Sequence, residues 1–227
     1  MDIEILQLID GAKKARGTTV IIDVFRAMTL EAYFLSGGAK KVIPIGDEET
    51  AYRLKRENPD HILAGERHGK ILPGFDTGNS PSQLSAIDFK GKAVIHTTSA
   101  GTQGIANAAR ADEILCGSLV TARATAEYIL KKNPERVSLV CMGLEALKET
   151  EEDTLCAEYI KSILEGRERD ISEDIKSLKF TSGAKFFDEK QKDVFPEEDF
   201  FLCTQLNKFD FVVRYDLKKH ITEKVTL

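Results

Sequence analysis

Short runs rich in Val and Ile alternate along this chain with amphipathic segments of helix length. The first strong run is Thr18–Asp23, and the segment from Ala27 to Ser36 that follows it stops at Gly37 and Gly38. Unbroken apolar strands are typical of a sheet that is covered on both faces. The pattern therefore predicts an α/β fold, a three-layer αβα arrangement with a largely parallel or mixed central sheet.

The same reasoning predicts the remaining elements of the first two thirds of the chain. The expected strands cover residues 41–45, 61–64, 92–97, 113–116 and 136–141. The expected helices cover residues 48–57, 101–110 and 120–132. Pro59 supports the end of the first of these helices, because proline breaks the helical hydrogen-bond pattern.

The chain changes character from about Glu151, where it becomes heavily charged and mostly helical. We interpret the charged runs 165–170 and 188–193 as solvated helix faces rather than a binding tail. A last run, residues 209–215, alternates in period two and is expected to rejoin the sheet at an edge. Because no linker rich in Gly, Ser or Pro interrupts the sequence, we expect a single domain over residues 1–227.

The charge of the chain restricts its partners. A formal net charge of −5 argues against non-specific binding to nucleic acid or to an anionic membrane surface. The N-terminus is acidic and lacks the pattern of a signal peptide, and no apolar stretch approaches the length of about 18 residues that spans a bilayer. We expect a cytoplasmic protein, and a homodimer by default.

The cysteines carry no paired motif. They lie singly, mostly within apolar runs, which predicts buried free thiols in a reducing compartment: Cys116, Cys141, Cys156 and Cys203. Neither a CxxC motif nor a Cys/His cluster with ligand spacing is present, so a structural zinc site is not expected.

Polar residues at the strand ends are the candidates for chemistry, because ligands of open α/β sheets bind beyond the carboxyl ends of strands. Asp23 and Arg26 follow the first strong strand. A carboxylate there can hold a divalent cation, and an arginine offers a planar set of donors for an oxyanion. The alternative is that Asp23 only caps the next helix and pairs with Arg26 at the surface.

The next candidates follow the expected strand 61–64. Glu66 and Arg67 place an acid beside a base between two glycines. The long loop 72–82 contains Asp76 and Asn79, and loops of this length are often functional. In the simpler interpretation, Asn79 or Ser80 caps a short helix that begins at Pro81.

Two further strand-to-helix junctions are candidate anion sites. Thr98, Ser99 and Gly101 precede a helix, where free backbone N–H groups and the helix dipole favour an anion, although no Walker loop is present. Ser118 and Arg123 follow a later strand that ends in Cys116. Six residues separate Cys116 from Arg123, one more than the cysteine phosphatases have, so a nucleophilic Cys116 is disfavoured.

The segment from Glu151 to Ala157 opens a helix with three acids. Acidic residues in a first turn complement the helix dipole, so a structural role is sufficient to explain them. Their expected position is on the same rim as Asp23 and Glu66, where Glu152 and Asp153 could complete a metal site or supply a base.

Taken together, these motifs resemble the 2-phosphosulfolactate phosphatase family. The resemblance runs from about residue 18 to the C-terminus and rests on the segments 23–27, 65–67, 74–81, 97–102, 117–118 and 152–157. It implies a magnesium-dependent phosphatase that hydrolyses 2-phospho-3-sulfolactate to 3-sulfolactate and phosphate, a step of coenzyme M biosynthesis. A departure is Ser99-Ala100, where the family has an Asn before the Gly. The substrate here could also be another small phosphorylated hydroxy acid.

The resemblance and the strand-end positions together assign expected roles. Catalytic roles fall to Asp23, Arg26, Glu66 and Asn79. The substrate-binding set is Arg67, Thr98, Ser99, Gly101, Ser118 and Arg123. The Mg²⁺ ligands are drawn from Asp23, Glu66 and Asp76, with Glu152 and Asp153 in reserve.

Other mechanisms and functions remain open on the sequence alone. Asp23 could be the nucleophile of a haloacid-dehalogenase-type phosphatase, although that family has an acid at the position that Phe25 occupies. Direct hydrolysis and a phospho-enzyme route are both open. A protein of another class, a non-catalytic binder of a small anion, would use the same crevice.

Overall fold

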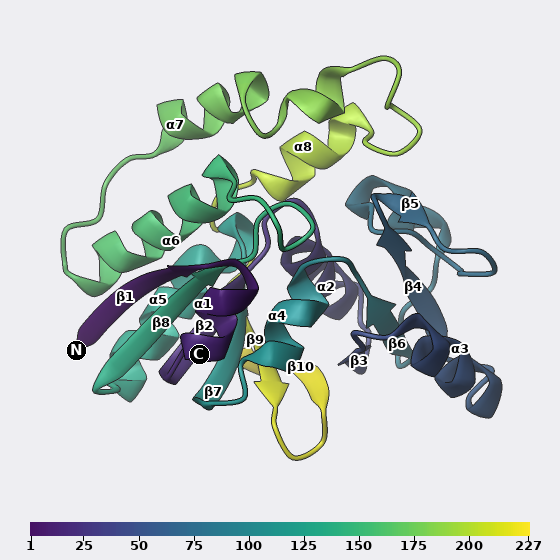
Figure 1. Ribbon diagram of the computed structural model, residues 1–227, viewed down its shortest axis with the longest axis horizontal. Coiled ribbons are helices and arrows are strands. Elements are labelled where there is room, and N and C mark those ends of the chain that lie inside the picture. The colour runs from purple at the N-terminus through teal and green to yellow at the C-terminus, as the bar shows by residue number, and fades with distance from the viewer.

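A ten-stranded mixed sheet with helices on both faces forms the body of the molecule (Figure 1). The computed structural model describes all residues from 1 to 227. In chain order the strands are β1 (Asp2–Gln7), β2 (Gly17–Ile22), β3 (Lys41–Pro44), β4 (Ile62–Arg67), β5 (Lys70–Ile71), β6 (Ala93–Thr97), β7 (Ala111–Gly117), β8 (Arg136–Cys141), β9 (Phe211–Asp216) and β10 (Ile221–Thr226). The predicted α/β class with a mixed, mostly parallel sheet is confirmed.

The helices lie between and after these strands. They are α1 (Leu8–Lys14), α2 (Ala27–Ser36), α3 (Glu48–Glu57), α4 (Gly101–Asn107), α5 (Ala122–Lys132), α6 (Glu151–Leu164), α7 (Ser172–Ser177) and α8 (Glu197–Cys203). Short 3₁₀ turns occur at Pro81–Ala86, Leu119–Thr121, Leu178–Phe180 and Ala184–Phe187. Among the predicted helices, that over 48–57 has the expected bounds, whereas that over 101–110 ends at Asn107.

The sheet consists of two parallel groups joined by a hairpin. Its order is β1-β8-β2-β7-β9-β10-β3-β6-β4-β5, in which β1, β8, β2 and β7 are parallel and so are β3, β6 and β4. The antiparallel hairpin β9–β10 lies between the groups and meets β3 through the single pair Thr222 and Val42. Figure 1 shows the two groups on the left and right, with the hairpin at the lower centre.

The expectation of a final edge strand is wrong. β9 lies inside the sheet, beside β7, and the chain returns as β10. The alternation of β9 reflects burial on both faces rather than one solvated face, because Phe211 and Val213 pack into one core cluster and Val212 into the other. The polar position Arg214 is satisfied across the hairpin by Glu223 at 2.6 Å.

Adjacent residues of the central strands bury opposite faces of the sheet. In β2, Ile21 packs with α2 and α4 side chains, whereas Val20 and Ile22 pack with α5 and α6 side chains. Such strands need helices on both sides, which is the predicted three-layer arrangement. All four cysteines are buried free thiols.

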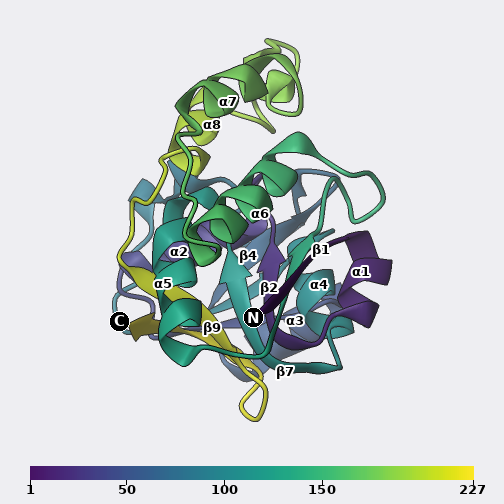
Figure 2. The same cartoon turned by 90° about the vertical axis from the view of Figure 1, so that its left-hand side faces the viewer.

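The C-terminal part is mostly helical, as predicted, and forms a cap over one end of the sheet. Figure 2 shows α7 and α8 above α6 at the top of the molecule. The charged runs 165–170 and 188–193 are solvated turns rather than helix faces. In the second run, the Asp188 carboxylate accepts hydrogen bonds from Lys190 N and Gln191 Nε2, which favours a turn over a helix. None of the helices combines the length and apolar composition needed to cross a bilayer.

Candidate active site

A cavity of about 330 Å³ lies where the two parallel groups of strands meet the cap. Five of the expected site residues line it: Asp23, Arg26, Glu66, Asn79 and Ser99. The rest of its lining comes from the segments after β2, β4, β6 and β8 and from the cap: Phe25, His68, Gly69, Ala100, Gly143, Leu144, Glu145, Lys185, Gln191 and Phe195. An adjoining hollow of about 380 Å³ shares Arg26, Gly69 and Asn79 with this cavity, whereas two larger grooves elsewhere contain none of the expected site residues.

Asp23 is the buried carboxylate at the end of β2. Its Oδ1 accepts a hydrogen bond from Ala27 N at 3.0 Å, and its Oδ2 accepts none from the protein. Burial, reinforced by the charges of Glu66 and Glu152, raises the pKa of Asp23 to about 6. The Oδ2 atom of Asp23 is therefore free to accept a hydrogen bond or to bind a cation, and the surroundings disfavour the negative charge of this carboxylate.

Gly101 makes room for this carboxylate. A methyl group on Gly101 would lie 2.9 Å from Asp23 Oδ2 and 2.5 Å from Met28 Cε, both too close for a real contact. The expected role of Gly101 was to hold an anion. The structure instead places it against Asp23, so its small size sets the position of α4 relative to that carboxylate.

Glu66 brings a second carboxylate from the other half of the sheet. Its Oε1 accepts a hydrogen bond from Ser99 N at 2.8 Å, and its Oε2 accepts from Gly69 N at 2.7 Å and Ser99 Oγ at 3.2 Å. The preceding Gly65 has a φ of +151° and lies so close to β6 that a Cβ would be 2.1 Å from Thr97 O. Glycine is therefore required where β4 delivers Glu66 to the cavity.

Arg26 is fixed between the sheet and the cap. Its Nη1 lies 2.6 Å from Asp199 Oδ2 of α8, and both side chains are almost fully buried. The guanidinium carbon lies 4.9 Å from the ring centre of Phe195. Asp199 also accepts a hydrogen bond from Ser82 N at 2.9 Å. One guanidinium edge is thus held by Asp199, and the side chain still lines the cavity.

Asn79 reaches the cavity from the long loop that the sequence singled out. Its side chain is buried, and its Oδ1 has no hydrogen-bond partner within the protein. The simpler interpretation, a side-chain cap on the 3₁₀ turn at Pro81, is not observed for Ser80 either. A buried unpaired amide oxygen facing a cavity is an acceptor that a ligand or water can use.

Glu152 and Asp153 lie behind the cavity at the start of α6, and neither lines it. Asp153 binds Val24 N and Gly143 N, each at 2.8 Å, so both of its oxygens hold backbone segments together. Glu152 Oε2 is buried without a partner. Burial raises the pKa of Glu152, and burial with the charges of Glu152 and Asp23 raises the pKa of Asp153 well above its usual range.

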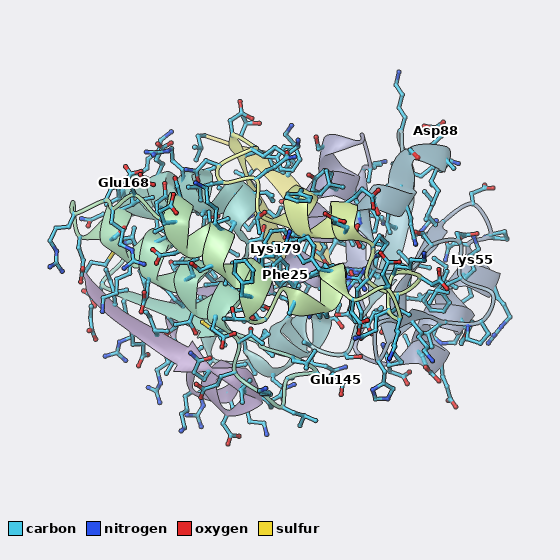
Figure 3. The ribbon with its side chains drawn as sticks, turned by 90° about the horizontal axis from the view of Figure 1, so that it is seen from above. Phe25, Lys55, Asp88, Glu145, Glu168 and Lys179 are labelled. Atoms are coloured by element: carbon cyan, nitrogen blue, oxygen red, sulfur yellow. The ribbon has the colours of Figure 1, made fainter.

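The other expected site residues lie away from the cavity. The Asp76 carboxylate binds Lys55 Nζ at 2.9 Å and Leu63 N at 2.7 Å, so it anchors the 72–79 loop. Arg123 pairs with Glu168 on the surface. Figure 3 shows Glu168 and Lys55 near opposite ends of the molecule, with the cavity residue Phe25 between them.

The three remaining residues do not line the cavity either. Arg67 donates to Glu66 O at 2.7 Å and Thr97 Oγ1 at 3.0 Å, which ties the ends of β4 and β6 together. Thr98 exchanges hydrogen bonds with Thr102 at the start of α4. Ser118, directly after β7, is fully buried, and its Oγ has no hydrogen-bond partner in the protein.

The sequence reasoning missed the part of the cavity that the cap supplies. Lys185 lines the cavity among aromatic rings, and Gln191 and Phe195 accompany it. No strand end precedes these residues, so the strand-end argument could not find them. The sequence does carry one sign of this aromatic cluster, because half of the twelve phenylalanines fall between residues 180 and 201.

The carboxylates of the cavity fit a magnesium ion that is only partly coordinated by the protein. No group of three or more His, Cys, Asp or Glu side chains is arranged to hold a metal ion. Mg²⁺ commonly uses one or two carboxylates, keeps several waters and takes further ligands from substrate phosphate. Asp23, with one free oxygen, and Glu66 match that donor set, and a cation there would offset both the burial and the neighbouring negative charges that raise the pKa of Asp23.

Comparison with known proteins identifies the family. The family model of 2-phosphosulpholactate phosphatase matches residues 3–218. The chain is 42% identical over 144 residues to a probable 2-phosphosulfolactate phosphatase of Caldicellulosiruptor saccharolyticus, covering 62% of this chain and 59% of that protein. It is 33% identical over 199 residues to a probable 2-phosphosulfolactate phosphatase of Bacillus subtilis, covering 86% and 85% of the two chains. A protein of the same printed name from Thermoplasma volcanium is 30% identical over 212 residues, which is 92% of this chain and 95% of that one. The resemblance predicted from the motifs is confirmed, and this chain belongs to the 2-phosphosulfolactate phosphatase family.

Proposed function

We propose that this protein is a Mg²⁺-dependent phosphatase that hydrolyses 2-phospho-3-sulfolactate, or a similar small phosphorylated hydroxy acid, to the hydroxy acid and phosphate. The names of its relatives suggest the substrate. The observation that carries the proposal is the meeting of Asp23 and Glu66, from the two halves of the sheet, in one cavity that Arg26 also lines. With this substrate the reaction would be a step of coenzyme M biosynthesis.

The carboxylate side of the cavity fits this substrate better with an added cation. The substrate carries a phosphate, a carboxylate and a sulfonate, whereas the acids Asp23, Glu66 and Glu145 outnumber the cations Arg26 and Lys185 in the same cavity. Anionic groups would repel each other there unless a cation stood between them. Asp23 and Glu66 would hold a magnesium ion, whose chemistry would be to neutralise charge that develops on the transferring phosphoryl group.

The protein groups then position the reacting atoms. The free donors of Arg26 would orient the phosphate oxygens. The Ser99 hydroxyl donates to Glu66 Oε2, so it would position that carboxylate. The unpaired Asn79 Oδ1 would accept a hydrogen bond from the attacking water. The water oxygen forms a bond to phosphorus, and the bond from phosphorus to the C2 oxygen breaks. Of the two protons of the water, one ends on the C2 oxygen of the released hydroxy acid and the other on the phosphate. Positioning and electrostatic stabilisation supply most of the catalysis in such reactions.

The test is phosphate release from a panel of phosphorylated hydroxy acids, with Mg²⁺ and with a chelator. We expect release with Mg²⁺ and a fall to background when the chelator removes the metal. Release that is insensitive to the chelator would contradict the metal assignment. Tight binding of the same compounds without any release would instead support a non-catalytic anion-binding protein.

A further inference from the structure

Lys185 differs from the other cations that line the cavity. Arg26 has Asp199 within 2.6 Å, and His68 has Glu145 within 2.7 Å. Lys185 lines the same cavity, and no carboxylate oxygen lies within the 4.0 Å that defines an ion pair. Its ammonium group is therefore the cavity cation whose hydrogen bonds are not committed to an acid of the protein.

Aromatic rings hold this ammonium group in place. Its Nζ lies 5.7 Å from the ring centre of Phe25, 5.5 Å from Phe186 and 5.2 Å from Phe195. Rings stabilise a cation through their negative faces without supplying a hydrogen-bond acceptor. The three N–H donors of Lys185 thus remain available to a ligand.

The backbone of Lys185 is fixed by its neighbour. Phe186 is 1% exposed and packs against Phe25 and Phe195 at ring-centre distances of 5.0 and 5.7 Å. Lys185 is consequently held in position from the cap side. Burial lowers the pKa of Lys185, and the negative charges of Glu152 and Asp23 act in the opposite direction. An anionic ligand would further favour the charged ammonium form.

Lys185 and the carboxylates belong to different walls of the cavity. Asp23 and Glu66 come from strand ends, whereas Lys185 comes from the turn Ala184–Phe187 of the cap. A substrate whose phosphate lies at the carboxylates would extend its other end toward the cap. The substrate proposed above carries two more anionic groups there.

We propose that Lys185 binds the second anionic group of the substrate, its sulfonate or carboxylate, and so makes the enzyme selective for phosphate esters that carry another negative charge. This inference rests on the proposed phosphatase function. Lys185 is a specificity-determining residue in this proposal, and the reacting phosphate stays with the sheet-edge groups.

The test compares two substrates in wild type, Lys185→Gln and Lys185→Arg. One substrate is 2-phospho-3-sulfolactate and the other is isopropyl phosphate, which has no second charge. We expect Lys185→Gln to lower the ratio of their kcat/KM values by about 10- to 100-fold, the effect of losing one charge-assisted hydrogen bond. Lys185→Arg should restore a large part of the ratio. An equal loss on both substrates would overturn the inference, since Lys185 would then serve the reacting phosphate.

The matched control is Lys179→Gln. Lys179 lies on the same cap and stacks on Phe187 at 4.0 Å, but it is exposed and does not line the cavity. The Lys179→Gln variant should have the same ratio of kcat/KM values for the two substrates as wild type. A lower ratio in this variant as well would mean that positive charge on the cap in general, rather than Lys185, selects the substrate.

Binding of 3-sulfolactate, measured by calorimetry with Mg²⁺ present, separates the two proposals. If wild type releases no phosphate from either ester, the proposed function fails, but Lys185→Gln should still weaken 3-sulfolactate binding by at least about tenfold. Equal binding by both proteins would overturn the role of Lys185 whether or not the enzyme turns over. Circular dichroism of each variant shows whether it is folded.

Discussion

The cavity has two walls that are built in different ways. The sheet wall consists of Asp23, Glu66 and Ser99, whose positions depend on hydrogen bonds from backbone amides. The cap wall consists of Lys185 and Phe195, which are held by packed aromatic rings. Backbone contacts at strand ends define positions closely, whereas the cap wall depends on side chains from a distant part of the chain. We infer that the sheet wall carries the chemistry and the cap wall carries selectivity.

The largest expected effect is on the sheet wall. Asp23→Asn keeps the oxygen that accepts from Ala27 N but removes the charge that would bind the cation. We expect kcat/KM to fall by on the order of 10²- to 10³-fold, as for loss of a metal ligand or key electrostatic group. Steady-state phosphate release measures this change.

The control for Asp23→Asn is Asp76→Asn. Asp76 was also an expected metal ligand, but its carboxylate binds Lys55 and Leu63 N outside the cavity. Its activity should stay within about threefold of wild type, because an exposed pair contributes little. If Asp76→Asn loses as much activity as Asp23→Asn, the division between cavity and loop residues is wrong.

The second effect concerns the buried ion pair of Arg26 and Asp199, which joins the sheet to the cap. Asp199→Asn leaves the Arg26 guanidinium buried without its carboxylate, since both side chains of the pair are at most 2% exposed. Removing one partner of a buried pair costs about 3 kcal/mol or more, so the free energy of unfolding should fall by that amount. Urea denaturation measures it.

A surface pair provides the comparison for Asp199→Asn. Arg53 and Glu57 form an ion pair at 3.1 Å with side chains 54% and 52% exposed. Glu57→Gln should change the free energy of unfolding by less than about 0.5 kcal/mol. An equal decrease in the free energy of unfolding of the two variants would show that the ion pair of Arg26 and Asp199 does not stabilise the cap on the sheet.

The sheet wall could be predicted from the sequence to a larger extent than the cap wall. Asp23 and Glu66 each stand at or just after an apolar strand, and the carboxyl ends of such strands gather ligands. The same position did not bring Asp76 to the cavity, because its backbone and carboxylate both bind Leu63 of β4 and its carboxylate also binds Lys55. The prediction from strand ends also failed for Arg123, whose helix α5 turns the side chain toward Glu168 on the surface.

The fold shows the same difference between local and distant information. The apolar runs in β2, β6 and β8 predicted those strands because both of their faces are buried. The hairpin β9–β10 was placed wrongly, since its position between β7 and β3 depends on pairing partners about a hundred and nearly two hundred residues away in sequence. Lys185 was missed for the same reason, as its neighbours Phe25 and Phe195 come together only in the folded chain.

The third effect concerns the stability of the sheet wall, because the charged form of Asp23 that would bind a cation also lowers the free energy of unfolding. Asp23 has a pKa of about 6 in the folded state and 3.8 as its ordinary value, so the folded state binds the proton more tightly. The free energy of unfolding of wild type should therefore decrease as pH rises from about 4 to above 6, relative to Asp23→Asn. At pH 8 without metal, the variant should be more stable by on the order of 3 kcal/mol.

Urea denaturation at pH 4 and pH 8, in the presence of a chelator, measures this difference. The two proteins should approach each other at pH 4, where Asp23 is protonated in the folded state. Addition of Mg²⁺ at pH 8 should stabilise wild type more than the variant, because only wild type keeps both carboxylates. A variant that is less stable than wild type at pH 8 would contradict the cost of the charged Asp23 carboxylate that we infer from its burial and from the charges of Glu66 and Glu152.

The smallest effect is expected at the mouth of the cavity, where His68 and Glu145 join the turn after β4 to the loop after β8. Their distance of 2.7 Å suggests a latch between the two halves of the sheet, but the His68 side chain is 80% exposed. Solvent screens such a pair, so His68→Gln should change the free energy of unfolding by less than about 0.5 kcal/mol in urea denaturation. A loss above about 1 kcal/mol would exceed what an exposed pair contributes, and the mouth would then share in holding the two halves together. Burial rather than distance decides this expectation, since the Arg26 and Asp199 pair has nearly the same separation and is expected to contribute several times more.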